Sequence, residues 1–357
     1  MASCYVHIPF CDSICSYCDF CRMMASESTK DRWLQRIVEE IKMQDVSNLD
    51  TLYFGGGTPS SLSLVQFETL ASCFQGAKEF TVECNPESLT LDKIRLYKKY
   101  GVNRISLGVQ SFQDPLLRKI NRKHTKEDVM RCISLLKEHG IFNISIDLMY
   151  GLPGQSLLDL KADLEIFHSL DLVHLSIYSL QIEANSVFGK QRIEPCDPDL
   201  EADMYEYICS YLENHGFLHY EISSFCKPGY YSKHNLAYWQ DEDFLGIGVG
   251  ASGKEAGIRY DNTKFLKQYL EQGSCRCFID ETKEERAFDA IMMALRTSFG
   301  LDVLKWNARY GMDFFKRYDL VLKKYADVLT IQDSFVVPSV QAMEILNTIL
   351  VDFLMVD

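Results

Sequence analysis

The stretch Cys11-Asp12-Ser13-Ile14-Cys15-Ser16-Tyr17-Cys18-Asp19-Phe20-Cys21 sets the chemistry and the fold class expected of this chain. Its first three cysteines are separated by three and then two residues, and three thiolates at this spacing can close one loop around a cubane iron-sulfur cluster. Such a loop leaves the fourth iron without a protein ligand. The sequence therefore predicts Cys11, Cys15 and Cys18 as ligands of a 4Fe-4S cluster with one open iron.

A zinc knuckle and unliganded surface thiols are the alternatives. A structural zinc site needs four closed ligands, usually in two paired halves. Another close pair, Cys275-Arg276-Cys277, has tighter spacing than such a half-site and stands alone. The spacing therefore favours the cluster.

Length and composition indicate a large globular chain. The 357 residues are 47% hydrophobic, which is enough for one large core and a smaller satellite domain. The net charge of -13 provides no basic footprint for nucleic acid. We find no signal peptide and no apolar run long enough to span a bilayer. Thirteen scattered cysteines then indicate a reducing, cytoplasmic compartment.

The first 225 residues show the pattern of repeated βα units. Short β-rich runs alternate with amphipathic stretches, of which 33–41 and 129–136 are the clearest helices. Unusual polar motifs fall just past the predicted strands, on the face where barrel enzymes build their sites. We therefore expect an α/β fold with a partial (β/α)6 barrel. Its predicted strands are Cys4–Ile8, Thr51–Phe54, Phe80–Cys84, Arg104–Leu107, Ile144–Leu148 and Leu175–Leu180.

The strand ends carry the candidate binding residues. After the second strand, glycines 55–57 let the backbone approach a ligand closely, although alone they would indicate only a flexible turn. Glu83 can accept from two ribose hydroxyls, or it is a solvated charge at the barrel mouth. Gln110 and Arg122 suit a carboxylate or a porphyrin propionate. Asp147 ends the fifth strand, and Tyr178 after it fits core packing as well as ligand contact.

The remainder of the chain contains a second motif. His234-Asn235-Leu236-Ala237-Tyr238-Trp239 combines an imidazole with flat aromatic rings, the groups that hold a heme, although a single His beside aromatics is ordinarily a satisfied, half-buried residue. A glycine-rich strand follows at 245–253. Beyond residue 270 we predict a small, mostly helical domain with a β-ribbon. Its expected elements are helices at 286–296, 314–325 and 340–353 and the ribbon at 329–337.

Together these motifs resemble the radical S-adenosylmethionine (SAM) superfamily. The flanks Tyr5-Val6-His7-Ile8-Pro9-Phe10 and Tyr17-Cys18-Asp19-Phe20 resemble its coproporphyrinogen oxidase-like branch, which holds the oxygen-independent oxidase HemN and the heme chaperone HemW. The resemblance covers most of the chain. It implies a radical SAM barrel at 1–225, a connecting segment at 226–270 and a HemN-type, winged-helix-like C-terminal domain at 271–357.

The resemblance also implies roles for the strand-end residues. A GGE-like segment, matched here by Gly56, Gly57 and Thr58, would bind the amino group of SAM. Glu83 and Asp147 match nucleoside contacts. His234 begins a match to the HNxxYW signature of HemW, which is tied to heme, and is therefore the expected heme ligand. No catalytic residue is assigned. The SAM contacts that we expect are Tyr5, Tyr17, Gly56, Gly57, Thr58, Glu83, Gln110, Arg122 and Asp147.

Two functions are compatible with this resemblance. The first is a heme-binding protein that delivers heme to acceptor proteins, including membrane-bound ones, with the cluster and SAM in a regulatory or redox role. The second is an oxidase that decarboxylates coproporphyrinogen III. Phe20 stands where the oxidase has a fourth cysteine, and the chain starts four residues before Tyr5, without the oxidase's long N-terminal arm. We therefore expect the heme chaperone, cytoplasmic or peripheral at a membrane. We expect it to have an electron donor such as flavodoxin or ferredoxin and no nucleic-acid partner.

Overall fold

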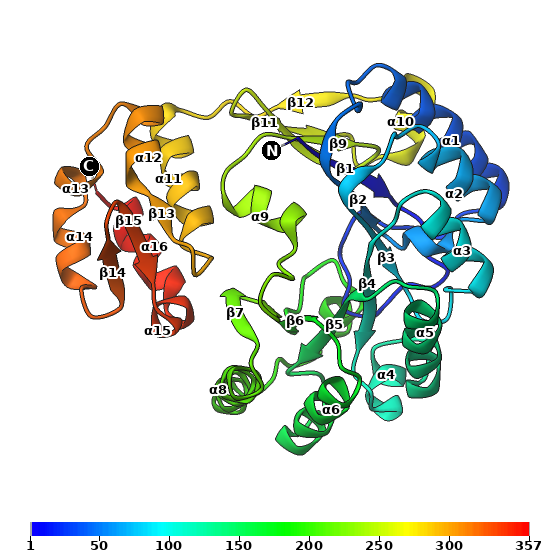
Figure 1. The fold of residues 1–357 in the computed structure, drawn as a ribbon, viewed down its shortest axis with the longest axis horizontal. Helices are drawn as coiled ribbons and strands as arrows, with labels where there is room; N and C mark the ends of the chain where they lie inside the picture. Colours follow the sequence, from blue (N-terminus) through cyan, green and yellow to red (C-terminus); the bar gives the residue numbers. More distant parts are fainter. Residues whose placement is uncertain (1, 357) are drawn as a thin grey trace.

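The computed structural model describes residues 2–356, and its largest feature is a twelve-stranded sheet (Figure 1). Six neighbouring strands in its middle are all parallel. They correspond to the six predicted strands, with bounds that differ by at most three residues. They are β1 (Ser3–Ile8), β2 (Leu49–Gly56), β3 (Ala77–Cys84), β4 (Arg104–Gln110), β5 (Asn143–Tyr150) and β6 (His174–Ser179).

Helices cover the outer face of these strands (Figure 1). The strand order runs in a line from β12 to β7, so the sheet is open. Six parallel strands in an open sheet, with helices on their outer face, are the predicted partial (β/α)6 barrel. The helices are α1 (Glu27–Lys42), α2 (Leu64–Ala71), α3 (Leu91–Lys99), α4 (Asp114–Lys119), α5 (Lys126–Glu138) and α6 (Leu157–Ser169), with a short 3-10 turn η1 (Pro59–Ser61).

Further strands extend the sheet at both ends. The glycine-rich strand predicted at 245–253 is divided: β9 (Phe244–Ile247) pairs in parallel with β1, whereas residues 248–251 form a turn before the next strand. Beyond it lie β10 (Ser252–Glu255), β11 (Ile258–Asn262) and β12 (Arg276–Phe278), and at the other end β8 (Ser224–Cys226) and β7 (Leu218–Glu221). The helices between them are α7 (Val187–Gln191), α8 (Pro198–Asn214), α9 (Lys233–Trp239) and α10 (Leu266–Gln272).

Local sequence explains where the outer helices begin and which face they bury. Ser26 caps α1, and its buried residues Trp33, Ile37 and Ile41 recur at helical spacing on one face. Thr125 caps α5 as predicted, and Asp128 completes a capping box with it. The apolar faces of these helices meet the parallel strands in one large core.

The C-terminal segment forms a second core with its own three-stranded sheet. Two predicted helices, at 314–325 and 340–353, are each interrupted. Tyr318 (φ -104°, ψ 19°) leaves the helical conformation and packs against Phe314 and Phe353, and Ile345 makes the second break. The elements are α11 (Lys283–Ala294), β13 (Leu301–Asp302), α12 (Val303–Tyr310), α13 (Phe314–Arg317), α14 (Asp319–Lys324), β14 (Leu329–Gln332), β15 (Phe335–Pro338), α15 (Val340–Glu344) and α16 (Leu346–Leu354).

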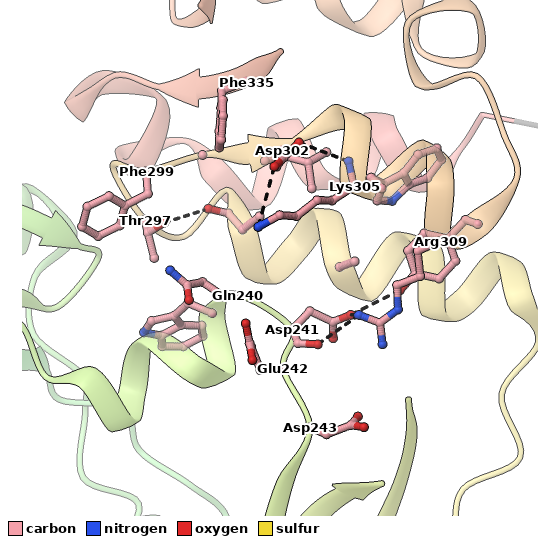
Figure 2. Close-up of a pocket in the computed structure, with 17 residues that line it drawn as sticks. Gln240, Asp241, Glu242, Asp243, Thr297, Phe299, Asp302, Lys305, Arg309 and Phe335 are labelled. Atoms are coloured by element: carbon pink, nitrogen blue, oxygen red, sulfur yellow. Dashed lines mark hydrogen bonds and ion pairs between the residues drawn. The ribbon is translucent and has the colours of Figure 1, made fainter. Parts of the chain in front are cut away.

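Among residues 2–356, two of the cavities outside these cores are large enough to hold a ligand. One lies at the ends of the parallel strands and has a volume of about 480 Å³. The other, of about 660 Å³, lies between the end of α9 and the C-terminal elements (Figure 2). Within residues 2–356, none of the helices combines the length and the apolar character needed to cross a bilayer.

Candidate functional site

The three predicted ligand cysteines lie in one loop between β1 and α1. Cys11 N donates to Met23 O at 2.9 Å and Met23 N donates to Pro9 O at 2.7 Å, which closes the base of this loop. A further bond from Thr58 N to Phe10 O, at 2.8 Å, ties the loop to the end of β2. The loop is therefore anchored beside the strand ends. Cys11, Cys15 and Cys18 all line the smaller cavity.

Residues from all six parallel strands, or from the turns that follow them, complete the wall of this cavity. Because parallel strands present their carboxyl ends at one edge, side chains far apart in sequence meet there. The strand-end cavity therefore brings together most of the predicted site. The predicted residues that line it are Cys11, Cys15, Tyr17, Cys18, Gly56, Gly57, Thr58, Glu83, Gln110, Arg122 and Asp147.

Polar groups surround the thiols. Thr58 Oγ1 donates to Cys11 Sγ at 3.4 Å, and Arg122 Nη1 donates to Cys15 Sγ at 3.5 Å. Burial raises the pKa of the Cys11 thiol to about 11, although the hydrogen bond from Thr58 acts to lower it. A cationic metal centre reverses this effect, because a coordinating thiol is deprotonated outright.

The glycine segment at the end of β2 is packed closely against the segment that contains His7, Pro9 and Phe10. Gly56 has φ +113°, and a Cβ built on it would lie 2.6 Å from the imidazole of His7. A Cβ on Gly57 would lie 2.8 Å from the backbone of Pro9 and Phe10. Only glycine therefore fits at these positions, and the N–H of Gly56 is held by Glu83 Oε2 at 3.1 Å.

Two carboxyl groups face the cavity from β3 and β5. Glu83 accepts from the Tyr53 hydroxyl at 2.7 Å, and burial raises its pKa to about 7. Asp147 accepts from the Ser106 hydroxyl at 3.2 Å, and burial raises its pKa to about 6 while Arg104 acts to lower it. Both groups therefore change charge close to neutral pH, where a cationic ligand would favour the ionised forms.

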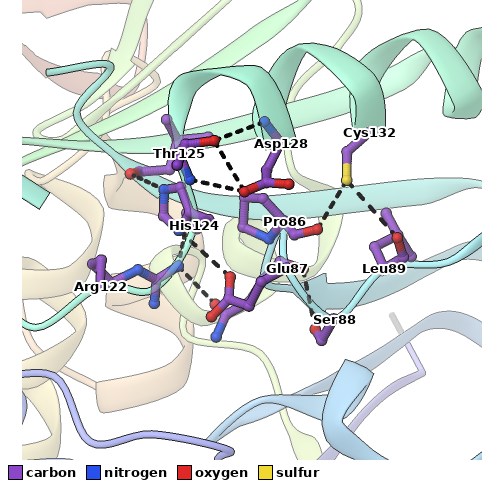
Figure 3. Close-up of polar contacts among 12 residues, drawn as sticks. Pro86, Glu87, Ser88, Leu89, Arg122, His124, Thr125, Asp128 and Cys132 are labelled. Atoms are coloured by element: carbon purple, nitrogen blue, oxygen red, sulfur yellow. Dashed lines mark hydrogen bonds and ion pairs between the residues drawn. The ribbon is translucent and has the colours of Figure 1, made fainter. Parts of the chain in front are cut away.

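A cluster of polar residues holds the Arg122 side chain in place (Figure 3). Its guanidinium donates to Asn85 Oδ1 at 2.8 Å and to the carbonyl of Gly108. Burial alone would raise the pKa of Glu87, but the neighbouring His124, whose Nδ1 lies 3.5 Å away, and the charge of Arg122 hold it below its ordinary value. The anionic Glu87 thus helps to keep the guanidinium in place beside Cys15.

The donor set suits a 4Fe-4S cluster. Within residues 2–356, no three His, Cys, Asp or Glu side chains stand close enough together to hold a single metal ion. In a cubane each cysteine binds a different iron, so its three sulfurs need not converge on one point. Three thiols around a cavity, with hydrogen-bond donors directed at two of them, are compatible with this arrangement.

Tyr5 and His234 lie outside the strand-end cavity. The ring of Tyr5 packs 5.9 Å from that of Tyr53, and its hydroxyl lies 3.1 Å from His7 Nδ1. His234 is 1% exposed, and its two ring nitrogens lie 2.8 Å from Thr51 Oγ1 and 2.6 Å from the Tyr238 hydroxyl. Both nitrogens have partners in this conformation, so iron ligation by His234 stays a prediction, and it requires the ring to give up at least one of the two.

Sequence reasoning left out several residues that line the strand-end cavity. Asn85 and Ser106 hold Arg122 and Asp147, and Arg22 donates to the carbonyl of Cys18. Asn85 carried a detectable signal, since it stands two residues after Glu83 at the same strand end. The thiol of Cys21 donates to Lys264 O at 3.7 Å, and this cysteine does not line the cavity.

Known families and proteins match this chain along most of its length. Residues 5–167 match the model of the radical SAM superfamily, and residues 282–339 match that of the HemN C-terminal domain. The "Heme chaperone HemW" of Lactococcus lactis is 41% identical over 88% of this chain and 87% of its own length. The Bacillus subtilis protein with the same name is 38% identical over 94% of this chain and 93% of its own length.

A solved structure matches the fold. Coproporphyrinogen III oxidase (HemN) from Escherichia coli superposes with a TM-score of 0.85 over 99% of this chain and 89% of its own length, at 23% sequence identity. That identity shows the fold alone, whereas the identity to the curated relatives shows the family. The chain belongs to the HemW family, within the HemN/HemW branch of the radical SAM superfamily.

Proposed function

We propose that this protein binds heme and SAM and delivers heme to acceptor proteins. The observation that carries this proposal is the identity of 41%, over most of both chains, to a relative named heme chaperone. Phe20, in the position where the oxidase has a cysteine, supports the same choice. The acceptors would include membrane-bound proteins, and a small redox protein such as flavodoxin or ferredoxin would supply electrons.

The strand-end cavity is the proposed site of the cofactors. Cys11, Cys15 and Cys18 would hold the 4Fe-4S cluster, which when bound supplies an electron to the sulfonium of SAM. The residues of the chain bind and orient SAM. The Gly56–Gly57 backbone approaches the ligand closely, and the Glu83 carboxylate accepts from ribose hydroxyls.

Arg122 and Asp147 would complete the orientation of SAM. Arg122 offers planar paired donors to a carboxylate, and it is already fixed by Asn85 and Gly108. Asp147, on β5, accepts a hydrogen bond from the Ser106 hydroxyl. Because their partners pre-order these side chains, little conformational entropy is lost when the ligand binds.

The test is heme transfer by the anaerobically reconstituted protein. The loaded protein should show a shifted Soret band when heme is added, and it should pass that heme to an apo-acceptor such as apomyoglobin. A protein that leaves the Soret band of free heme unchanged at micromolar concentration would contradict the proposal.

The oxidase is the second candidate, because the fold closely matches HemN. The reconstituted protein would be mixed with coproporphyrinogen III, SAM and a reductant. Accumulation of protoporphyrinogen through repeated turnovers would replace the chaperone with the oxidase, whereas no product is expected if the chaperone assignment is right.

A further inference from the structure

One residue joins the two hydrogen-bond donors that face the thiols of the cysteine loop. Thr58 Oγ1 donates to Cys11 Sγ at 3.4 Å, and Arg122 Nη1 donates to Cys15 Sγ at 3.5 Å. Thr58 lies just past β2 and Arg122 just past α4, yet both side chains contact the same amide, that of Asn85. Asn85 is therefore one hydrogen bond away from the donors to two of the three predicted cluster ligands.

The partners of Asn85 determine which way its amide faces. Arg122 Nη2 lies 2.8 Å from Asn85 Oδ1, and a guanidinium has only donors, so the amide oxygen faces it. The amide nitrogen then donates to Thr58 Oγ1 at 3.4 Å. Because this bond uses Oγ1 as an acceptor, the hydroxyl proton of Thr58 is left for Cys11. A single amide thus directs a hydroxyl and a guanidinium toward two sulfurs.

The backbone of Asn85 is anchored on both sides. Its N–H donates to Ser60 Oγ at 3.0 Å, and its carbonyl accepts from Ser88 N at 3.1 Å. Pro86 follows it and favours an extended backbone at Asn85. A Cβ on Gly108 would lie 3.3 Å from Asn85 Oδ1, so a glycine there leaves room for the amide. The position of the amide is therefore set by the chain itself.

Hydrogen bonds to cluster sulfurs are one of the properties that set the reduction potential of an iron-sulfur cluster. The reduced state carries one more negative charge than the oxidised state, and donors beside the thiolates stabilise the more negative state more strongly. Such donors therefore raise the reduction potential. Arg122 adds a full positive charge to this effect, whereas Thr58 adds only a dipole.

We propose that Asn85 is a positioning residue that raises the reduction potential of the cluster by directing Thr58 at Cys11 and Arg122 at Cys15. The inference rests on the proposed function, since it requires the cluster that the three cysteines would hold. In the reduction, one electron leaves the small redox protein and is taken up by the cluster, and no bond forms or breaks. Asn85 changes only how favourable that transfer is.

A direct contact with SAM is the competing role, because Asn85 also lines the strand-end cavity. The two roles affect different states of the protein. A SAM contact changes the affinity for SAM, whereas the inferred role already operates in the SAM-free protein. The potential is therefore measured without SAM, and the dissociation constant of SAM is measured separately.

The experiment is a redox titration of the anaerobically reconstituted full-length protein, followed by the electron paramagnetic resonance signal of the reduced cluster. Asn85→Asp retains an acceptor for Arg122 but cannot donate to Thr58, whose hydroxyl then turns to the new carboxylate instead of Cys11. With the added negative charge, reduction should become at least about tenfold less favourable, which is about 59 mV for a one-electron couple. Asn85→Ala releases both donors and should disfavour reduction by about threefold.

Two further variants test the route and the charge. Thr58→Val removes the donor to Cys11, and Asn85→Ala should shift the potential less in the Thr58→Val background than in wild type, because part of its effect passes through Thr58. The matched control is Asn48→Asp, which adds the same charge at an exposed position before the start of β2, at the opposite end of that strand from Thr58. It should change the reduction equilibrium by less than about twofold.

The outcomes separate this inference from the proposed function. An unchanged potential in both Asn85 variants would overturn the inference, and so would equal shifts in Asn85→Asp and Asn48→Asp. Weaker SAM binding with an unchanged SAM-free potential would make Asn85 a SAM contact instead. A wild-type protein that assembles no cluster, as iron content and visible absorption report, would overturn the cofactor assignment itself.

Thr58→Val keeps the inference testable if the Asn85 variants fail to hold a cluster. It alters the donor to Cys11 while leaving the amide and its contact with Arg122 in place. A potential equal to that of wild type in Thr58→Val would then overturn the inference, whereas a more negative one would support it.

Discussion

At the scale of single residues, Glu83 is the group whose charge should control SAM binding. Burial raises its pKa to about 7, so at neutral pH a large fraction of the free protein carries a protonated Glu83. The SAM ligand is cationic at its sulfonium and amino groups, and it therefore favours the ionised carboxyl. Binding should release a proton and should weaken as the pH falls.

The prediction is that the dissociation constant of SAM for the cluster-loaded protein rises as pH falls through about 7. The rise is at most about tenfold per pH unit, because one proton is linked to binding. Glu83→Gln should bind more weakly and should lose this pH dependence. Isothermal titration calorimetry in buffers of different ionisation enthalpy would measure both the affinity and the released proton. An unchanged pH profile in Glu83→Gln would assign the proton to another group, such as Asp147.

The raised pKa of Glu83 also determines how the stability of the ligand-free protein changes with pH. The folded pKa of Glu83 is raised above the unfolded value of about 4.3, so the contribution of this group is fully present at low pH and is lost as pH rises through about 7. Glu83→Gln should therefore gain stability relative to wild type above about pH 7, by up to about 4 kcal/mol. Urea unfolding at several pH values would check it.

At the scale of elements, α9 joins the barrel to the second cavity. His234 lies near its start, where its ring stacks on Tyr53 at 4.9 Å, and Trp239 ends it. The backbone N–H of His234 also donates to Glu79 Oε1 at 3.0 Å. Burial lowers the pKa of His234 to about 3, so the ring is neutral and its contacts are hydrogen bonds rather than ion pairs.

We expect His234→Ala to destabilise the protein by about 2–4 kcal/mol, because it leaves Thr51 and Tyr238 without a buried partner and removes the stacked ring. Chemical unfolding of the cluster-free chain measures this directly. His168→Ala, at an exposed position of α6, is the control and should cost less than about 0.5 kcal/mol. A loss no larger than that of the control would mean that His234 does not support α9.

The secondary-structure elements also show how much of the structure could be predicted from the sequence alone. The six parallel strands and the strand-end site were predictable, because each strand is a local run followed at once by its polar motif. The partner of His234 was not, since Thr51 lies 183 residues away. The second cavity was missed for the same reason: Trp239, Phe299, Lys305 and Phe335 come from separate segments, and only the packing of the C-terminal elements brings them together.

The interrupted C-terminal helices illustrate another limit of sequence reasoning. Helical periodicity continues through Tyr318 and Ile345, so the pattern alone predicts unbroken helices. The breaks arise where a large side chain is needed in the second core, as Tyr318 is against Phe353. Tertiary packing overrides local propensity at such positions.

At the scale of the whole molecule, the two cavities are distinct, and α9 lies between them. The strand-end cavity is lined by Cys11, Glu83 and Asp147, whereas Trp239 and Lys305 line the other. A ligand in the second cavity would therefore leave the SAM site open. One route between them runs through α9, from Trp239 to the contact between His234 and Tyr53. Another runs through β7, where Glu221 pairs with Thr297.

His234, the expected heme ligand, lies outside the strand-end cavity, so we predict that saturating heme changes the dissociation constant of SAM by less than about threefold, as expected for sites with no shared contacts. Equilibrium dialysis of labelled SAM against the cluster-loaded protein, with and without heme, would measure it. S-adenosylhomocysteine, which shares the nucleoside and amino acid groups of SAM, serves as the control and should raise the apparent constant in proportion to its concentration. If heme behaves like this competitor, it occupies the strand-end cavity, and His234 is not its ligand.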